Sequence, residues 1–345
     1  MTPRPDPRRA TGFRRRTALL LVALGLLCVV AVINSILPGQ AGEPQRITIP
    51  AGDGFGQVTD TLVSRGIVRS RFWFKLIAKI RGLDRSVRAG IYEIAPGESP
   101  WQVLSLLQRG RIASVRFTVP EGLSLLETAA LAERDLGVPR DSFLAAVRDP
   151  DEAARARLVV PTLEGFLLPE TYQVPVGSSA RDVVRIMAKA FAAAWKPAWD
   201  ARLDTLGVTR QEIVTLASII EGEARVDAER KIISGVYHNR LRIGMALQAD
   251  PTVQYALEVK TGKPKPRLYQ KDYDTPSPYN TYLHPGLPPG PIDSPGLSSL
   301  EAALYPADVP FFYFVARPDG HHVFSRTYDQ HLRAVARARG ERVEP

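Results

Sequence analysis

The chain has 345 residues, of which 45% are hydrophobic and 23% are charged. This balance is typical of folded proteins and excludes a globally disordered chain, and the length allows two or three domains of roughly 150 residues each. The 26 glycines and 29 prolines follow no Gly-X-Y period, which excludes collagen.

The formal net charge of +9 is concentrated at the start of the chain. Residues 1–16 contain six arginines and one aspartate and so carry five of the nine excess charges. The rest shows neither a basic-zipper region nor an RNA-binding aromatic motif. We therefore expect no nucleic-acid partner and interpret residues 1–16 as a basic cytoplasmic tail.

Residues 17–37 form an uncharged apolar stretch of 21 residues. As an α-helix it would be about 31 Å long, which matches the hydrocarbon core of a bilayer. We predict a single transmembrane helix in contact with the lipid bilayer; the alternative is a cleaved signal peptide, for which Ala41-Gly42 is a poor cleavage site. Because arginines stay on the cytoplasmic side, the remainder is expected on the periplasmic or extracytoplasmic side of the plasma (inner) membrane.

The single cysteine, Cys28, lies within this apolar stretch. The exported part therefore has neither a disulfide nor a thiol nucleophile, which excludes papain-like chemistry.

After a polar linker at 38–45, the chain contains an internal repeat. Residues 47–52 (ITIPAG) are matched by residues 117–122 (FTVPEG). Each copy has the pattern of a strand, a Pro/Gly turn and two helices, followed by a second shared turn and a further helix. We predict two related units near 46–112 and 116–196; the alternative is that a common pattern recurs by chance. The expected elements are strands at 46–49 and 90–94 and helices at 56–65, 70–81, 100–109 and 180–194.

The last part, 205–345, differs in composition. A helix is predicted at 209–233, followed by a Pro/Gly/Tyr-rich stretch from about 261 to 296. That stretch is too long for an ordinary connection, and its four tyrosines favour a functional segment over a disordered one. A helix near 297–305, an apolar strand at 311–315 and a basic helix at 327–339 complete an α+β fold.

The sequence lacks the residue patterns that several kinds of catalysis require. No HExxH or paired CxxC motif is present, and the spacing of His321, His322 and His331 matches no zinc pattern, so no metal is expected. The chain has no Gly-x-Ser-x-Gly elbow and no phosphate-binding glycine loop, and no cofactor is expected. Carboxylate chemistry remains.

Glu221 and Glu223 are the carboxylates that stand out. Apolar residues at 213, 216, 217 and 220 form a helical stripe that packs into a core, so both acids lie at the rim of that core. Partial desolvation would raise the pKa of such a carboxyl, as a general acid requires. The two acids lie about 200° apart on a regular helix and cannot share one site. Periodicity does not choose between them, and an ion pair between Glu221 and Arg225 is the non-catalytic alternative.

Four ordered segments together resemble the YceG-like family of membrane-anchored endolytic murein transglycosylases. They are LASIIE at 216–221, NRLRIGMALQADPT at 239–252, PYNTY at 278–282 and GLPPG at 286–290. The segment LEGFLLPETY at 163–172 and the terminal YFVA at 313–316 extend the resemblance, which covers about residues 46–335.

The resemblance implies a lyase that cleaves β-1,4 bonds between N-acetylmuramic acid and N-acetylglucosamine within peptidoglycan strands and leaves 1,6-anhydromuramic ends. By motif, the single catalytic glutamate of the family corresponds to Glu221, which would act first as acid and then as base; Glu223 would have a supporting role. The family also implies a LysM-like βααβ module at 46–112, followed by the catalytic domain at 113–345.

Five residues are candidates for lining the sugar groove, because amide, hydroxyl and aromatic groups suit sugar hydroxyls and ring faces. These are Gln248, Asp250, Tyr279, Asn280 and Thr281. Local turn chemistry is the alternative for each.

Two rival functions remain open. The chain could be a non-catalytic peptidoglycan-binding scaffold for peptidoglycan synthases, which are possible partners in either case. It could also be a hydrolase that uses Glu221 together with a distant acid such as Asp250 and adds water to its products.

Overall fold

The structure is a computed structural model. It describes residues 37–39, 42–50, 53–83, 87, 90–109, 114–158 and 160–340, together with positions 22, 25, 26, 29 and 33. Among these residues no helix combines the length and the apolar character needed to cross a membrane. The predicted span at 17–37 lies almost entirely outside the described residues.

The chain divides into two compact units. The first comprises the residues up to Ser114 together with Pro175–Gly177, and the second comprises Val115–Val174 and Ser178–Pro345. Across the described residues the only sheets are three pairs of strands, β1 with β2, β3 with β4, and β5 with β6. The mixture of helices with small sheets agrees with the predicted α+β class.

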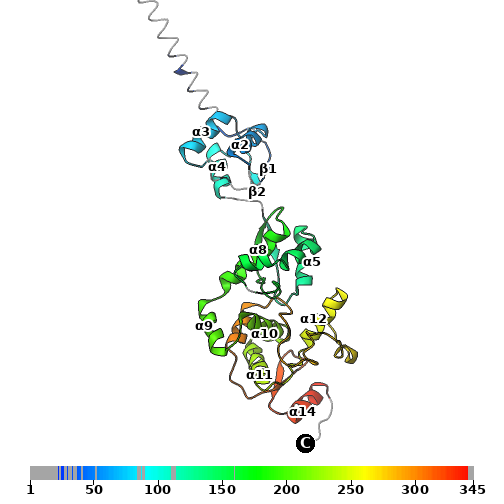
Figure 1. The fold of residues 1–345 in the computed structure, drawn as a ribbon. Helices are drawn as coiled ribbons and strands as arrows, with labels where there is room; N and C mark the ends of the chain where they lie inside the picture. Colours follow the sequence, from blue (N-terminus) through cyan, green and yellow to red (C-terminus); the bar gives the residue numbers. More distant parts are fainter. Residues whose placement is uncertain are drawn as a thin grey trace, which may run out of the picture. The chain divides into compact units, whose positions relative to one another are not determined.

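In the first unit a two-stranded sheet packs against three helices (Figure 1). Strands β1 (Gln45–Ile49) and β2 (Gly90–Ile94) are antiparallel, with Ile47 opposite Tyr92. Helices α2 (Phe55–Ser64) and α3 (Arg71–Ile80) lie between the strands in sequence, and α4 (Pro100–Arg109) follows them. The elements of this βααβ order lie where the sequence predicts them; the relation to LysM modules stays a prediction.

The second unit begins with the same order of elements. Its first part contains β3, α5, α6, β4 and α8, with one short additional helix, α7. Gly66 lies two residues and Gly137 one residue after the first helix of its copy, and both adopt a positive φ of 68°. The bounds are β3 Ser114–Thr118, α5 Leu125–Leu136, α6 Arg140–Val147, α7 Pro150–Arg155, β4 Thr171–Pro175 and α8 Ala180–Ala194.

Helix α10 (Arg210–Glu223) runs through the centre of the second unit (Figure 1). Eight consecutive residues, from Ile213 to Ile220, are buried, because the helix is covered by α11, α12 and α13. Thr209 and Glu212 form a capping box at its start. The remaining bounds are α9 Pro197–Leu206, η1 Asp227–Glu229, α11 Arg230–Arg242, α12 Asp250–Thr261, η2 Gln270–Asp272, α13 Leu297–Leu304, β5 Tyr313–Ala316, β6 His322–Ser325 and α14 Tyr328–Ala338.

The predicted continuous helix at 209–233 is wrong. Ala224 has an extended backbone (ψ 108°) that ends α10 immediately after Glu223. The helical Gly222 weakens the last turn and lies so close to Pro251 that an added Cβ would be 2.7 Å from the proline ring. The break lets the chain turn back, so that Arg230 at the start of α11 reaches Glu221.

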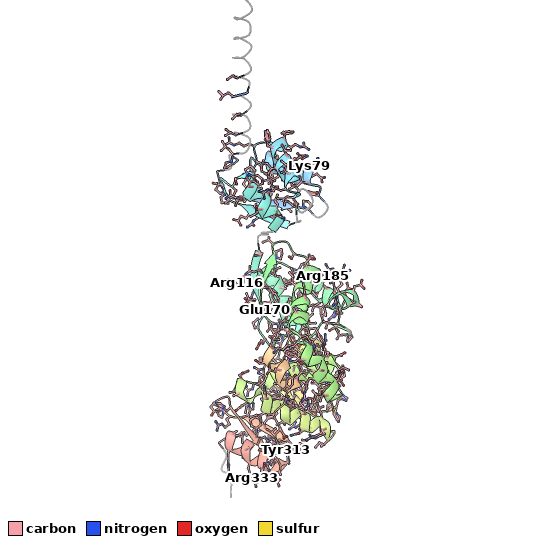
Figure 2. All side chains as sticks on the ribbon, turned by 90° about the vertical axis from the view of Figure 1, so that its left-hand side faces the viewer. Lys79, Arg116, Glu170, Arg185, Tyr313 and Arg333 are labelled. Carbon is pink, nitrogen blue, oxygen red and sulfur yellow. The ribbon has the colours of Figure 1, made fainter. Side chains whose placement is uncertain are left out.

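The long stretch at 261–296 is folded onto the second unit. The side-chain amide of Asn280 donates to the backbone oxygens of Tyr273 and Thr275, at 2.8 and 3.0 Å. The backbone N–H of Gln248 donates to the oxygen of Thr281 at 3.2 Å. These bonds hold the stretch against the start of α12. The β5 and α14 elements, marked by Tyr313 and Arg333 in Figure 2, follow near the end of the chain.

Candidate active site

Glu221, in the last turn of α10, is fixed by two contacts. Its Oε2 accepts a hydrogen bond from the Gly296 backbone N–H at 3.0 Å and lies 3.2 Å from Nη1 of Arg230. The side chains of Glu221 and Arg230 are only 9% and 11% exposed. Arg230, rather than the Arg225 considered in the sequence, is therefore its ion-pair partner, and the pair is buried.

A second acid, Glu121, lies beside this pair and was not selected from the sequence. It lies in the turn after β3, so close to Gly296 that a Cβ added to this glycine would collide with the Glu121 carboxylate. Burial and the charge of Glu221 raise the pKa of Glu121. The backbone of this turn bonds to Ser294 through Gly122 and Leu123. The repeated Pro-x-Gly turn marks this loop in the sequence but does not reveal that it meets α10.

Glu223 has different surroundings, as the helical spacing predicts. The Tyr237 hydroxyl donates to its Oε1 at 3.1 Å. Burial raises the pKa of Glu223 to about 7, and the nearby charge of Asp250 contributes in the same direction. A carboxyl of this kind is substantially protonated at neutral pH and can donate a proton.

Glu223 lies on the wall of a cavity in the second unit that has a volume of about 800 Å³ and is called the larger cavity below. The walls come from the end of α10, the start of α12, the segment around 266–282, β5 and α14. Gln248 and Asp250 line the same cavity, together with Tyr273, Tyr282 and Tyr313. Two of the five predicted groove residues therefore share a cavity with Glu223. Glu221 is not among the lining residues.

Asp250 is oriented by two tyrosines. The hydroxyl of Tyr282 donates to its Oδ1 at 2.7 Å, and that of Tyr273 to its Oδ2 at 3.3 Å. The rings of these tyrosines pack against each other with centroids 4.7 Å apart. The structure thus supplies an acid and aromatic faces on the wall that faces Glu223.

The other three predicted groove residues use their polar groups within the protein. Asn280 is fully buried in the backbone bonds described above. The Thr281 hydroxyl accepts from the Ala249 N–H at 3.0 Å. Tyr279 packs on Tyr255 at 4.8 Å. None of the three is among the residues that line the larger cavity, so the structure does not bring them together with Glu223.

A buried acid, Glu164, links the start of α5 to α12. Its carboxyl oxygens accept from the Leu125 N–H and the Tyr255 hydroxyl, both at 2.9 Å. Burial raises its pKa to about 8. Within the described residues, no group of three or more His, Cys, Asp or Glu side chains is arranged to hold a metal ion.

We expect Glu164 to make stability fall as the pH rises. The folded state holds the Glu164 proton up to a pKa of about 8, whereas the unfolded chain releases it near its ordinary value, so the stabilisation present in acid is lost between these pH values. Glu164→Gln should flatten this dependence and stabilise the protein by roughly 2 kcal/mol at pH 8.5. Urea unfolding at pH 5 and pH 8.5 measures this; equal slopes in both proteins would contradict it.

A carboxyl whose pKa is raised to about 7, at a cavity with aromatic and polar walls, has the features that general-acid chemistry requires. The chain belongs to the YceG-like family, whose model matches residues 47–337.

Known relatives agree with this assignment. The chain is 32% identical over 305 residues to the endolytic murein transglycosylase of Bacillus subtilis, covering 84% of this chain and 83% of that one. It is 29% identical over 348 residues to the protein of the same name in Streptococcus pneumoniae, covering 92% of this chain and 63% of that one. The crystal structure of a yceG-like protein from Listeria monocytogenes superposes with a TM-score of 0.58 at 31% identity, over 85% of this chain and 99% of that one.

Proposed function

We propose that this protein is a membrane-anchored endolytic peptidoglycan lytic transglycosylase that cuts nascent glycan strands and so terminates their elongation. The observation that carries the proposal is Glu223, a carboxyl with a pKa of about 7 at the wall of the larger cavity. The names of the relatives support the substrate class.

The proposed reaction needs one carboxyl that acts twice. Protonated Glu223 donates its proton to the glycosidic oxygen as the bond from that oxygen to C1 of N-acetylmuramic acid breaks. The muramic 6-hydroxyl oxygen then bonds to C1, and its proton passes to the Glu223 carboxylate. The products are a free N-acetylglucosamine 4-hydroxyl and a 1,6-anhydromuramic end, with no water consumed.

Two observations favour Glu223 over Glu221 for this role. Glu223 lines the larger cavity and has a pKa near neutrality, so it can donate a proton to a molecule bound there. Glu221 is engaged with Arg230 and the Gly296 N–H and does not line that cavity. Catalysis by Glu221, which the family motif implies, is the alternative.

Asp250 is expected to set the pH range of activity. Since Glu223 must be protonated to act as an acid, activity should fall as the pH rises through its pKa of about 7. Asp250→Asn removes a negative charge that raises this pKa, so the decline should move to lower pH by roughly one unit. A pH profile of kcat/KM tests this. An unmoved decline would mean that another group controls it.

Product analysis distinguishes the candidate reactions. A soluble form that starts near residue 42 is incubated with uncross-linked peptidoglycan strands, and the fragments are examined by mass spectrometry. Internal fragments with anhydromuramic ends support the lyase. Reducing ends that carry an added water would assign a hydrolase, for which Asp250 is the second acid. Strand binding without cleavage would favour the scaffold.

The anchor and the first unit complete the proposal. We infer that residues 17–37 hold the enzyme at the plasma membrane with the catalytic unit outside the cytoplasm, and that the βααβ unit binds glycan strands in the manner of a LysM module. Release of the full-length protein from membranes by high salt would contradict the anchor. Unchanged strand affinity after removal of the first unit would contradict its binding role.

A further inference from the structure

A second cavity, of about 240 Å³, adjoins the one that contains Glu223. Both are lined by Gly222, Pro251 and Gln254. The second cavity extends from these shared residues toward the start of α5, where Ser124 and Glu127 lie. The second cavity therefore lies beside a molecule bound at Glu223.

The wall of the second cavity carries an excess of carboxyl groups. Glu127, Glu258 and Asp293 line it. Glu164 lies behind the wall residue Tyr255 and is bonded to its hydroxyl. Among the described residues that line this cavity, Lys265 is the sole basic one, and its Nζ is 2.6 Å from Asp272. The carboxyl groups thus face the cavity without a matching cation.

Asp293 is the least satisfied of these acids. It is 6% exposed, and its Oδ1 has no hydrogen-bond partner anywhere in the part of the chain that the structure describes. By contrast, Glu258 accepts from the Ser124 hydroxyl at 2.9 Å. Burial raises the pKa of Asp293 well above its usual range, and the charges of Glu221 and Glu164 add to this. A buried carboxyl that lacks a donor costs free energy, which a donor from a ligand would recover.

We propose that the second cavity binds a primary ammonium group of the glycan-strand substrate, with Asp293 as its main partner. The inference rests on the proposed function. An ammonium group offers three donors and a positive charge in a volume that the cavity accommodates. The acids are not arranged as ligands of one metal ion. On binding, the ammonium donates to the Asp293 carboxylate, and the proton held by that carboxyl is released to solvent.

This site would let the enzyme distinguish free stems from cross-linked ones. In peptidoglycan whose stem peptides contain a diamino acid, the side-chain amine is free before cross-linking and acylated afterwards. An acylated amine carries no charge, so it loses the contact with Asp293. The preferred substrate is then a strand whose stems are not yet cross-linked at that amine. A de-N-acetylated amino sugar is a second source of the same group.

The test compares strands that differ only in the amine. Uncross-linked strands with lysine-containing stems are used as prepared, after N-acetylation of the stem amines, and after the same treatment followed by partial de-N-acetylation of the sugars. Wild type, Asp293→Asn, Glu127→Gln and a matched control, Asp135→Asn, are assayed. Asp135 is a carboxylate on α5 paired with Arg134 and does not line the cavity. Glutamine at 127 can keep the N-cap bond to Ser124.

We expect stem acetylation to lower kcat/KM of the wild type and of Asp135→Asn by roughly tenfold, through KM, because a charge-assisted hydrogen bond is lost. Asp293→Asn should cleave the unmodified and the stem-acetylated strands with the same kcat/KM, equal to the wild-type value for acetylated strands. Glu127→Gln should show a smaller difference in kcat/KM between these two strands than the wild type. No loss on stem acetylation, together with a gain after de-N-acetylation of the sugars, would support the ammonium site and assign it to the sugar. Equal cleavage of all strands by the wild type, or a full preference in Asp293→Asn, would overturn it.

A binding measurement separates this inference from the proposed function. Saturation-transfer NMR with a lysine-containing stem tripeptide and its Nε-acetyl form needs no cleavage. Binding of the free amine alone, lost in Asp293→Asn, supports the site even if no strand is cut. Cleavage of strands without any such preference leaves the lyase intact and refutes the site. Circular dichroism confirms that each variant is folded.

Discussion

Replacing Glu223 by glutamine should lower kcat for strand cleavage by about 10³-fold, because the amide can neither donate the proton to the glycosidic oxygen nor accept the one from the 6-hydroxyl. The substitution keeps the shape of the side chain and removes a carboxyl whose burial is unfavourable, so the fold should not suffer. Strand binding should be retained. The rate of release of anhydromuramic fragments, measured beside strand affinity, checks both expectations.

Glu221→Gln is the decisive comparison for this prediction. It removes the neighbouring carboxyl of the same helix, which does not line the larger cavity. Assayed at a temperature where the variant is folded, it should lose less than roughly tenfold in kcat, since its effect reaches the cavity only through the backbone of α10. If instead Glu221→Gln is inactive while Glu223→Gln cleaves strands, the family motif has identified the acid and Glu223 is a supporting residue.

Local patterns predict most of the fold of the first unit. Its strands and helices are separated by Gly and Pro turns and carry clear apolar periodicity, so their positions follow from residues that are neighbours in sequence. The break after Glu223 could not be predicted in this way. Ala224 and Arg225 are favourable helix residues, and the break depends on Pro251 and on the return of Arg230 to Glu221. These are contacts between distant segments.

The candidate site likewise combines features that the sequence predicts with features that depend on the tertiary structure. The sequence singles out both acids of α10 and places them on opposite sides of the helix, and Gln248 and Asp250 do lie in one cavity with Glu223. The raised pKa of Glu223 was not predictable, because it depends on burial of this carboxyl and on the charge of Asp250. Glu121 and Asp293 are isolated acids in loops, and only the tertiary structure brings them to α10.

Breaking the buried pair of Glu221 and Arg230 should cost about 3 kcal/mol of unfolding free energy, the usual penalty for leaving one buried charge without its partner. Arg230→Met leaves the Glu221 carboxylate with the Gly296 N–H alone, whereas Glu221→Gln leaves the guanidinium with Asp227 and Ser299. The double variant Glu221→Gln/Arg230→Met removes both charges and should be destabilised by less than the sum of the single variants.

A double-mutant cycle measures this coupling. The free energy of unfolding of the second unit is obtained from urea titrations of the wild type, the two single variants and the double variant. A coupling above roughly 1 kcal/mol supports a structural pair that fixes the end of α10 and hence the position of Glu223. The matched control is the exposed pair of Arg317 and Asp319, for which a cycle should give no resolvable coupling. Coupling at Glu221 and Arg230 as small as in that exposed pair would mean that the end of α10 is held by packing against Pro251 rather than by charge.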